Sequence, residues 1–153
     1  MTAYEMGYHT RGRAVGYVRV FEKGRHSYEH LATRQIDLIS GWAVENDADV
    51  LDFFFDIGVD ATAPFQERPA GVRLLDRARC GDVNFVVVAS LDAFGKAQVL
   101  LDALKLLTSA NDGLGIVAVL PSPREELAFL GFRRVGLGPT APLEPQVGPE
   151  ALN

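Results

Sequence analysis

The sequence has 153 residues, of which 48% are hydrophobic and 23% are charged, a balance typical of one soluble globular domain. Its longest apolar runs, such as Phe85–Ala89, are far shorter than the roughly 20 residues of a membrane-spanning helix, and Met1–Arg13 lacks the features of a secretory signal, so we expect a cytoplasmic protein. The net charge of −5 argues against a protein that grips DNA through a basic face.

The first predicted strand is Ala14–Val20, which follows an N-terminal extension of residues 1–12. The first predicted helix is Tyr28–Glu45, and Ser27 is a suitable N-cap immediately before it. Residues spaced three and four apart give this helix one face toward the core: Leu31, Gln35, Leu38, Ile39 and Trp42.

The rest of the domain repeats this alternation of strand and helix. The predicted elements are, in order, a strand, a helix, a strand, a helix and a strand: Val50–Phe55, Ala70–Ala78, Asn84–Ser90, Lys96–Ala110 and Gly115–Leu120. Short strands alternating with helices predict an α/β fold with three layers, in which helices flank a mostly parallel sheet.

Beyond residue 120 the pattern changes. Arg124–Leu130 is compatible with one more short helix, and four of the eight prolines lie in the last fifteen residues. We therefore place the domain at residues 13–135 and expect residues 136–153 to be extended or disordered.

The sequence indicates no cofactor and no metal. The single cysteine, Cys80, has no second thiol with which to form a disulfide or a metal site. His26 and His30 are spaced like a ligand pair, but neither His9 nor any other residue supplies a third ligand at a suitable spacing. No glycine-rich nucleotide-binding motif is present.

Four short motifs follow one another along residues 13–120. Gly16–Phe21 reads G-Y-V-R-V-F, and Thr33-Arg34-Gln35 lies in the first helix. Phe55–Thr62 reads F-D-I-G-V-D-A-T and is followed by Glu67-Arg68-Pro69. Val86–Lys96 reads V-V-V-A-S-L-D-A-F-G-K. In order and approximate spacing, these motifs resemble the catalytic domain of the serine recombinases, the resolvase and invertase family.

The resemblance implies a reaction and also shows what this chain lacks for it. The family cuts and rejoins DNA by attacking a backbone phosphate with a serine hydroxyl, while arginines hold the phosphate's charge. Here Phe21 stands where the family has its nucleophilic serine, and a phenyl ring cannot attack. Ala93 and Lys96 stand where the family has two phosphate-binding arginines. We therefore expect that the chain is not an enzyme.

The other family positions keep their residue types, so the resemblance implies a vestigial pocket rather than an intact one. Its residues are Tyr17, Arg19, Phe21, Gln35, Asp56, Arg68, Asp92, Ala93 and Lys96. Neither nearby serine replaces the nucleophile: Ser27 is better explained as a helix cap, and we place Ser90 on the opposite side of its motif from the missing arginines.

Two phenylalanines are expected to lie where the resemblance implies the polar catalytic pocket. Phe21 ends the first strand and Phe94 follows the third, and the carboxyl ends of those strands lie side by side in a parallel sheet. The two rings are therefore predicted to meet. They would then either close the pocket or form an exposed apolar contact surface for a partner or for self-association.

Three functions remain open on the sequence. The first is a non-catalytic scaffold for protein interactions or regulation, with weak or no DNA binding of its own. The second is an accessory subunit that modulates a DNA recombinase or another DNA-bound complex. The third is an enzyme that acts on a small anionic ligand through Arg19, Arg68, Asp92 and Lys96, although structural ion pairs account for the arginines as readily.

Overall fold

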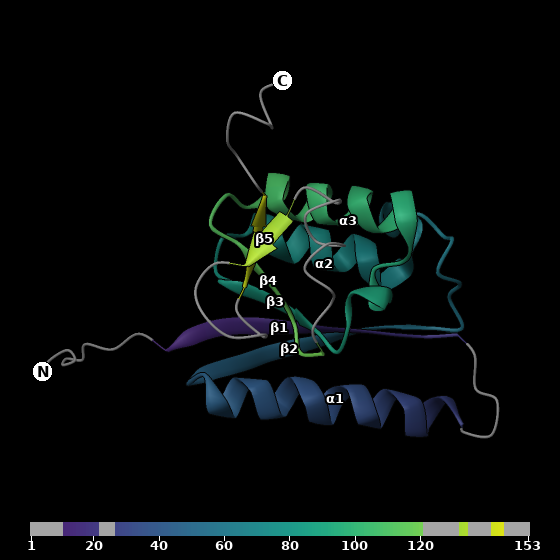
Figure 1. The fold of residues 1–153 in the computed structure, drawn as a ribbon, viewed down its shortest axis with the longest axis horizontal. Coiled ribbons are helices and arrows are strands. Elements are labelled where there is room, and N and C mark those ends of the chain that lie inside the picture. Colours follow the sequence, from purple (N-terminus) through teal and green to yellow (C-terminus); the bar gives the residue numbers. More distant parts are fainter. Residues whose placement is uncertain (1–10, 22–26, 121–131, 135–141, 146–153) are drawn as a thin grey trace, which may run out of the picture.

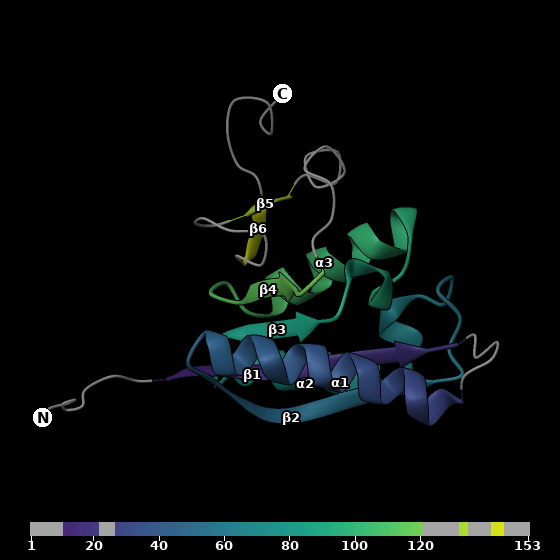
Figure 2. The ribbon, with the colours of Figure 1, turned by 60° about the horizontal axis from the view of Figure 1, so that its bottom comes forward.

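The computed structural model describes residues 11–21, 27–120, 132–134 and 142–145. Four parallel strands form the sheet in the order β2-β1-β3-β4, and two short antiparallel strands continue it as β6-β5 (Figures 1 and 2). The strands are β1 (Gly12–Val20), β2 (Ala48–Ile57), β3 (Phe85–Val88), β4 (Gly115–Ala118), β5 (Phe132–Arg134) and β6 (Leu143–Pro145). The expected α/β fold with a mostly parallel sheet is confirmed.

Helices cover the two faces of the sheet and complete the three layers. Helix α1 (Tyr28–Glu45) lies on one face, and helices α2 (Pro69–Arg79) and α3 (Ala97–Ala110) lie on the other (Figure 1). Ser27 caps α1 as expected, because its hydroxyl oxygen accepts a hydrogen bond of 3.1 Å from the backbone N–H of His30. Two short 3-10 helices, η1 (Phe65–Glu67) and η2 (Leu91–Ala93), precede α2 and α3.

Each face of the sheet has its own hydrophobic core. Under α1, Val18 and Val87 pack with Ile39 and Trp42 of the helix. The core under α2 and α3 is larger and includes four ring-bearing side chains, those of Tyr17, Phe54, Phe65 and Phe94. The alternation of side chains along β1 explains this division, since successive residues of a strand point to opposite faces.

The C-terminal part of the sheet contains a strand that the sequence does not predict. Residues 143–145, expected to be extended or disordered, are extended and form β6, which pairs with both β4 and β5. The sheet therefore continues past residue 135, the predicted domain boundary. The predicted helix Arg124–Leu130, the extension up to residue 10 and the rest of the C-terminal segment lie outside the described residues. None of the helices in the described ranges has the length and hydropathy needed to span a membrane.

Candidate functional site

The site lies at the carboxyl ends of the parallel strands, and its innermost residue is Asp56 at the end of β2. This carboxylate is 2% exposed. It accepts hydrogen bonds from the backbone N–H groups of Ala70 (2.8 Å) and Gly71 (3.1 Å) in the first turn of α2. Arg68 occupies the N-cap position of α2 and offers no capping side chain, so Asp56 satisfies these backbone donors from another strand.

Tyr17 of β1 joins this carboxylate to a buried arginine. Its hydroxyl donates to Asp56 Oδ2 (2.7 Å) and accepts from Arg68 Nη1 (3.1 Å). Burial raises the pKa of Tyr17 far above its usual value, although the neighbouring Arg68 opposes that shift. The ring stacks on Phe94 at 5.7 Å and meets Phe65 edge-on at 5.2 Å. The hydroxyl is therefore held as a neutral bridge inside the core.

Arg68 is 1% exposed, and its donors are directed at the backbone. Its guanidinium donates to the carbonyl oxygens of Ala63 (2.9 Å), Ala93 (2.9 Å) and Phe94 (2.7 Å). It also lies over the ring of Phe65, 5.6 Å from the centroid. Charged donors on buried carbonyls hold the loop before α2 against the turn before α3.

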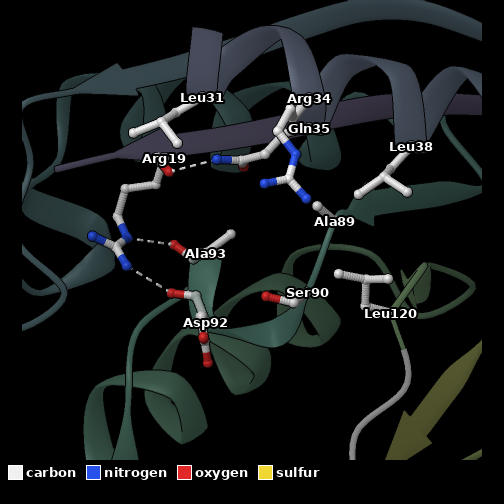
Figure 3. Close-up of a pocket in the computed structure, with 10 residues that line it drawn as sticks. All are labelled: Arg19, Leu31, Arg34, Gln35, Leu38, Ala89, Ser90, Asp92, Ala93 and Leu120. Carbon is white, nitrogen blue, oxygen red and sulfur yellow. Dashed lines mark hydrogen bonds between the residues drawn. The ribbon is translucent and has the colours of Figure 1, made fainter. Parts of the chain in front are cut away.

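Arg19 lies closer to solvent and also donates its hydrogen bonds to loop carbonyls. Its guanidinium donates to the carbonyl oxygens of Val59 (2.9 Å), Asp92 (2.9 Å) and Ala93 (3.1 Å). The amide of Gln35 in α1 donates to the Arg19 carbonyl at 3.0 Å (Figure 3). Partial burial lowers the pKa of Arg19, and the nearby charge of Arg68 adds to that effect. Both arginines thus clamp the same two segments, residues 59–63 and 92–94.

An open cavity of about 350 Å³ lies outside this network. Phe21, at its wall, is 42% exposed, and Asp92 and Lys96 are exposed beside it. Asp60 also lines the cavity, and hydrogen bonds from the backbone N–H and the hydroxyl of Thr62 lower the pKa of that carboxyl. The cavity therefore combines an exposed phenyl ring with two cations, Arg19 and Lys96, and two carboxylates.

The expected meeting of Phe21 and Phe94 is wrong. Phe94 is fully buried, and its ring contacts are with Tyr17 and Phe65. The strands β1 and β3 do end side by side, but helix η2 turns the chain back before Phe94, whose side chain enters the core beneath α3. Phe94 therefore cannot belong to a contact surface, and Phe21 alone of the two presents an exposed ring.

The structure separates the residues of the expected pocket by burial. Tyr17, Asp56, Arg68 and Ala93 are buried, Arg19 and Gln35 are half-buried, and Phe21, Asp92 and Lys96 are exposed. Ser90 does not line the cavity with Phe21; it lines a neighbouring one, shown in Figure 3. In the described part of the chain, no group of three or more His, Cys, Asp or Glu residues could hold a metal ion.

Sequence reasoning missed that backbone carbonyls are the main partners of Arg19 and Arg68. Nothing in the spacing of the residues indicates such contacts, because the acceptors belong to loops. The capping role of Asp56 had a detectable signal. The helix that begins at Pro69 is preceded by Arg68 rather than by Ser, Thr, Asp or Asn, so its N-terminal donors need an acceptor from elsewhere.

Comparison with known proteins places this geometry in context. Residues 14–124 match the family model described as the N-terminal domain of resolvases. No curated protein matches the sequence significantly.

Solved structures share the fold at low sequence identity. The N-terminal catalytic domain of TP901-1 integrase is 21% identical with a TM-score of 0.57, and the match covers 70% of this chain and 76% of that one. The C-terminal catalytic domain of ISC1926 TnpA, an IS607-like serine recombinase, is 22% identical with a TM-score of 0.58, covering 70% of each chain. A resolvase family site-specific recombinase from Streptococcus pneumoniae is 18% identical with a TM-score of 0.56, covering 71% and 72%.

Proposed function

The chain belongs to the resolvase N-terminal domain family, and we propose that within this family it is a non-catalytic member that serves as a scaffold for protein interactions or regulation. The observation that carries the proposal is the use of Arg19 and Arg68. Each donates three hydrogen bonds to backbone carbonyls, which supports a structural role for the two retained arginines.

The positions at which the chain differs from the family it resembles support the same proposal. At Phe21, the position that the resemblance assigns to the nucleophile, no oxygen or sulfur is available to attack a phosphorus atom. Ala93 has no charge, and Lys96 lacks the planar fork with which arginine binds two phosphate oxygens. Asp60 and Asp92 offset the positive charges of Arg19 and Lys96 in the cavity, which weakens its attraction for a phosphodiester.

Phe21 is the best candidate for a contact with a partner. It is a large apolar side chain, 42% exposed, at the wall of a cavity whose other exposed side chains are charged. Aromatic residues of this kind act as anchors at protein interfaces. The partner can be a regulatory protein or, in the alternative form of the proposal, a DNA-bound recombinase that this chain modulates.

Two measurements on the purified protein test the proposal. A gel assay with the host's genomic DNA and with supercoiled plasmid should show neither nicking nor a protein–DNA adduct that survives denaturation. Binding to duplex DNA at physiological salt should be non-specific and weaker than about micromolar. A covalent adduct, or a sequence-dependent nanomolar complex formed by the protein alone, would contradict the proposal.

The interaction role needs its own test. Affinity capture from the host, with Phe21→Ala as the matched variant and Val72→Ala as a control at an equally exposed apolar position on α2, should give partners that are lost only with Phe21→Ala. Partners that bind all three proteins equally would show that Phe21 is not the contact. Co-purification of DNA-bound recombinases would favour the accessory-subunit form.

A further inference from the structure

A second cavity, of about 270 Å³, lies between the N-terminal half of α1 and the ends of β3 and β4 (Figure 3). It adjoins the cavity at Phe21 but has polar groups of its own, and a ligand bound there does not depend on the proposed function. Its lining is mixed in character, with polar groups on α1 and η2 and aliphatic side chains around them: Arg19, Leu31, Arg34, Gln35, Leu38, Ala89, Ser90, Asp92, Ala93 and Leu120.

Arg34 distinguishes this cavity from the rest of the site. Arg19 and Arg68 direct their donors at carbonyl oxygens, whereas Arg34 makes no hydrogen bond or ion pair with any of the residues that the structure describes. Its side chain reaches from α1 into the cavity in Figure 3. A guanidinium presented in this way has its planar fork available for an acceptor from outside the chain.

Ser90 supplies a second available donor on the other side of the cavity. Its hydroxyl caps no helix and has no hydrogen-bond partner among the described residues. Asp92 also lines the cavity, but Figure 3 shows its carboxylate directed away from both Arg34 and Ser90. Two donors therefore face the same space without an acceptor of the chain between them.

The remaining walls are apolar. Leu31 and Leu38 lie on α1 either side of Arg34, and Leu120, just beyond β4, is 48% exposed. Covering this exposed leucine and its two half-buried neighbours with an apolar group removes apolar surface from water, which lowers the free energy. A cavity of about 270 Å³ lies near the lower end of the volumes of small-molecule sites, so a small ligand suits it.

We propose that this cavity binds a small molecule in which a carboxylate is attached to a short apolar body. The carboxylate accepts two parallel hydrogen bonds from Arg34 and a third from Ser90, and the apolar body lies among Leu31, Leu38 and Leu120. A doubly charged phosphate fits less well, because Arg34 is the one described lining cation that no group of the chain already engages, and half of the lining is aliphatic.

The test is a titration of the whole chain with hexanoate, followed by NMR at the methyl groups of Leu31, Leu38 and Leu120. Hexan-1-ol keeps the apolar body without the charge, and acetate keeps the carboxylate without the apolar body. Inorganic phosphate is an anion with neither a carboxylate nor an apolar body. Hexanoate should shift these methyl signals with a dissociation constant of about a millimolar and bind at least tenfold more tightly than the other three.

Variants test whether the carboxylate binds at Arg34 and Ser90. Arg34→Gln should raise the dissociation constant of hexanoate about tenfold or more, because it removes the charged fork and its paired hydrogen bonds. Ser90→Ala should raise it several-fold, because one hydrogen bond to the carboxylate is lost. Arg73→Gln, at an exposed arginine on α2 across the sheet, is the matched control and should leave binding unchanged.

Three results would overturn the proposal: equal binding of hexanoate and hexan-1-ol, unchanged binding in Arg34→Gln, or no methyl shift with hexanoate. Binding of an acetylated peptide that ends in leucine with a free carboxylate, in the absence of hexanoate binding, would likewise replace the small-molecule site by a site for a chain terminus.

Discussion

The inner and outer parts of the strand-end site follow different rules. Inside, Tyr17, Asp56 and Arg68 are buried, hydrogen-bonded to one another or to the backbone, and retain the residue types of the family that the chain resembles. Outside, Phe21 and Lys96 are exposed and stand where the resemblance implies a serine and an arginine, whereas Asp92, also exposed, keeps its residue type. Burial in a hydrogen-bonded core is therefore enough to explain why the inner polar residues are present.

The largest effect is expected when the inner network loses its cation. Arg68→Met leaves the carbonyl of Phe94 and the hydroxyl of Tyr17 without this donor inside the core, and it leaves the carbonyl of Ala93 with Arg19 alone. It should lower the free energy of unfolding by about 3–5 kcal/mol, measured by urea denaturation. Arg73→Met, on the exposed side of the same helix, should change it by less than about 0.5 kcal/mol. Similar values for the two variants would remove the distinction between inner and outer residues.

Phe94 and Phe21 allow the inner and outer parts of the site to be compared with uncharged side chains. Phe94→Ala opens a cavity among Tyr17, Phe65 and the α3 core, so a loss of about 3–5 kcal/mol is expected. Phe21→Ala removes a ring that is 42% exposed and should cost less than about 1 kcal/mol. Melting temperatures of the two variants provide the measurement. A large destabilisation by Phe21→Ala would mean that this ring closes the pocket rather than facing a partner.

A smaller effect is expected from the bridging hydroxyl. Tyr17→Phe keeps the ring but leaves Asp56 and Arg68 short of one hydrogen bond each, which should cost about 1–3 kcal/mol. The loss should appear in chemical denaturation at neutral pH, where the hydroxyl is protonated in both the folded and unfolded states. Unchanged stability would show that water or a small movement satisfies both partners.

Tyr17 should also make the free energy of unfolding depend on pH. In the unfolded chain Tyr17 releases its proton near pH 10, whereas burial raises its pKa in the folded protein. Above pH 10 the unfolded state therefore binds fewer protons, and the free energy of unfolding should fall by at most about 1.4 kcal/mol per pH unit. Tyr17→Phe should lack this contribution, so the difference in slope between the two proteins measures it. Parallel slopes above pH 10 would contradict the burial of the hydroxyl.

Much of the fold could be predicted from the sequence because it depends on local patterns. The bounds of α1 and its Ser27 cap follow from apolar spacing and one hydroxyl, and the four parallel strands follow from short β-branched runs. Strand β6 could not be predicted, since Leu143–Pro145 has no such pattern and forms only by pairing with β4 and β5. Its existence depends on tertiary contacts.

The residues of the site could be predicted from the sequence, but their contacts could not. Motif order identified Tyr17, Arg19, Asp56 and Arg68, yet their partners are loop carbonyls and helix N–H groups, which every residue type carries. Phe94 was misplaced because the rule that strand ends meet says nothing about the turn after the strand. Arg34 and Ser90 share a cavity for a similar reason, since only the folded chain brings α1 and η2 together.

The most direct test of the division between inner and outer residues is to restore the nucleophile alone. Phe21→Ser should be incubated with supercoiled plasmid and with the host's genomic DNA, denatured, and analysed for a covalent phosphoserine adduct, with an active serine recombinase on its own site as the positive control. No adduct is expected, because Arg19 and Arg68 remain bound to carbonyls and because Ala93 and Lys96 cannot replace the missing arginines. An adduct formed by Phe21→Ser would show that the pocket still holds a phosphate and would contradict the division.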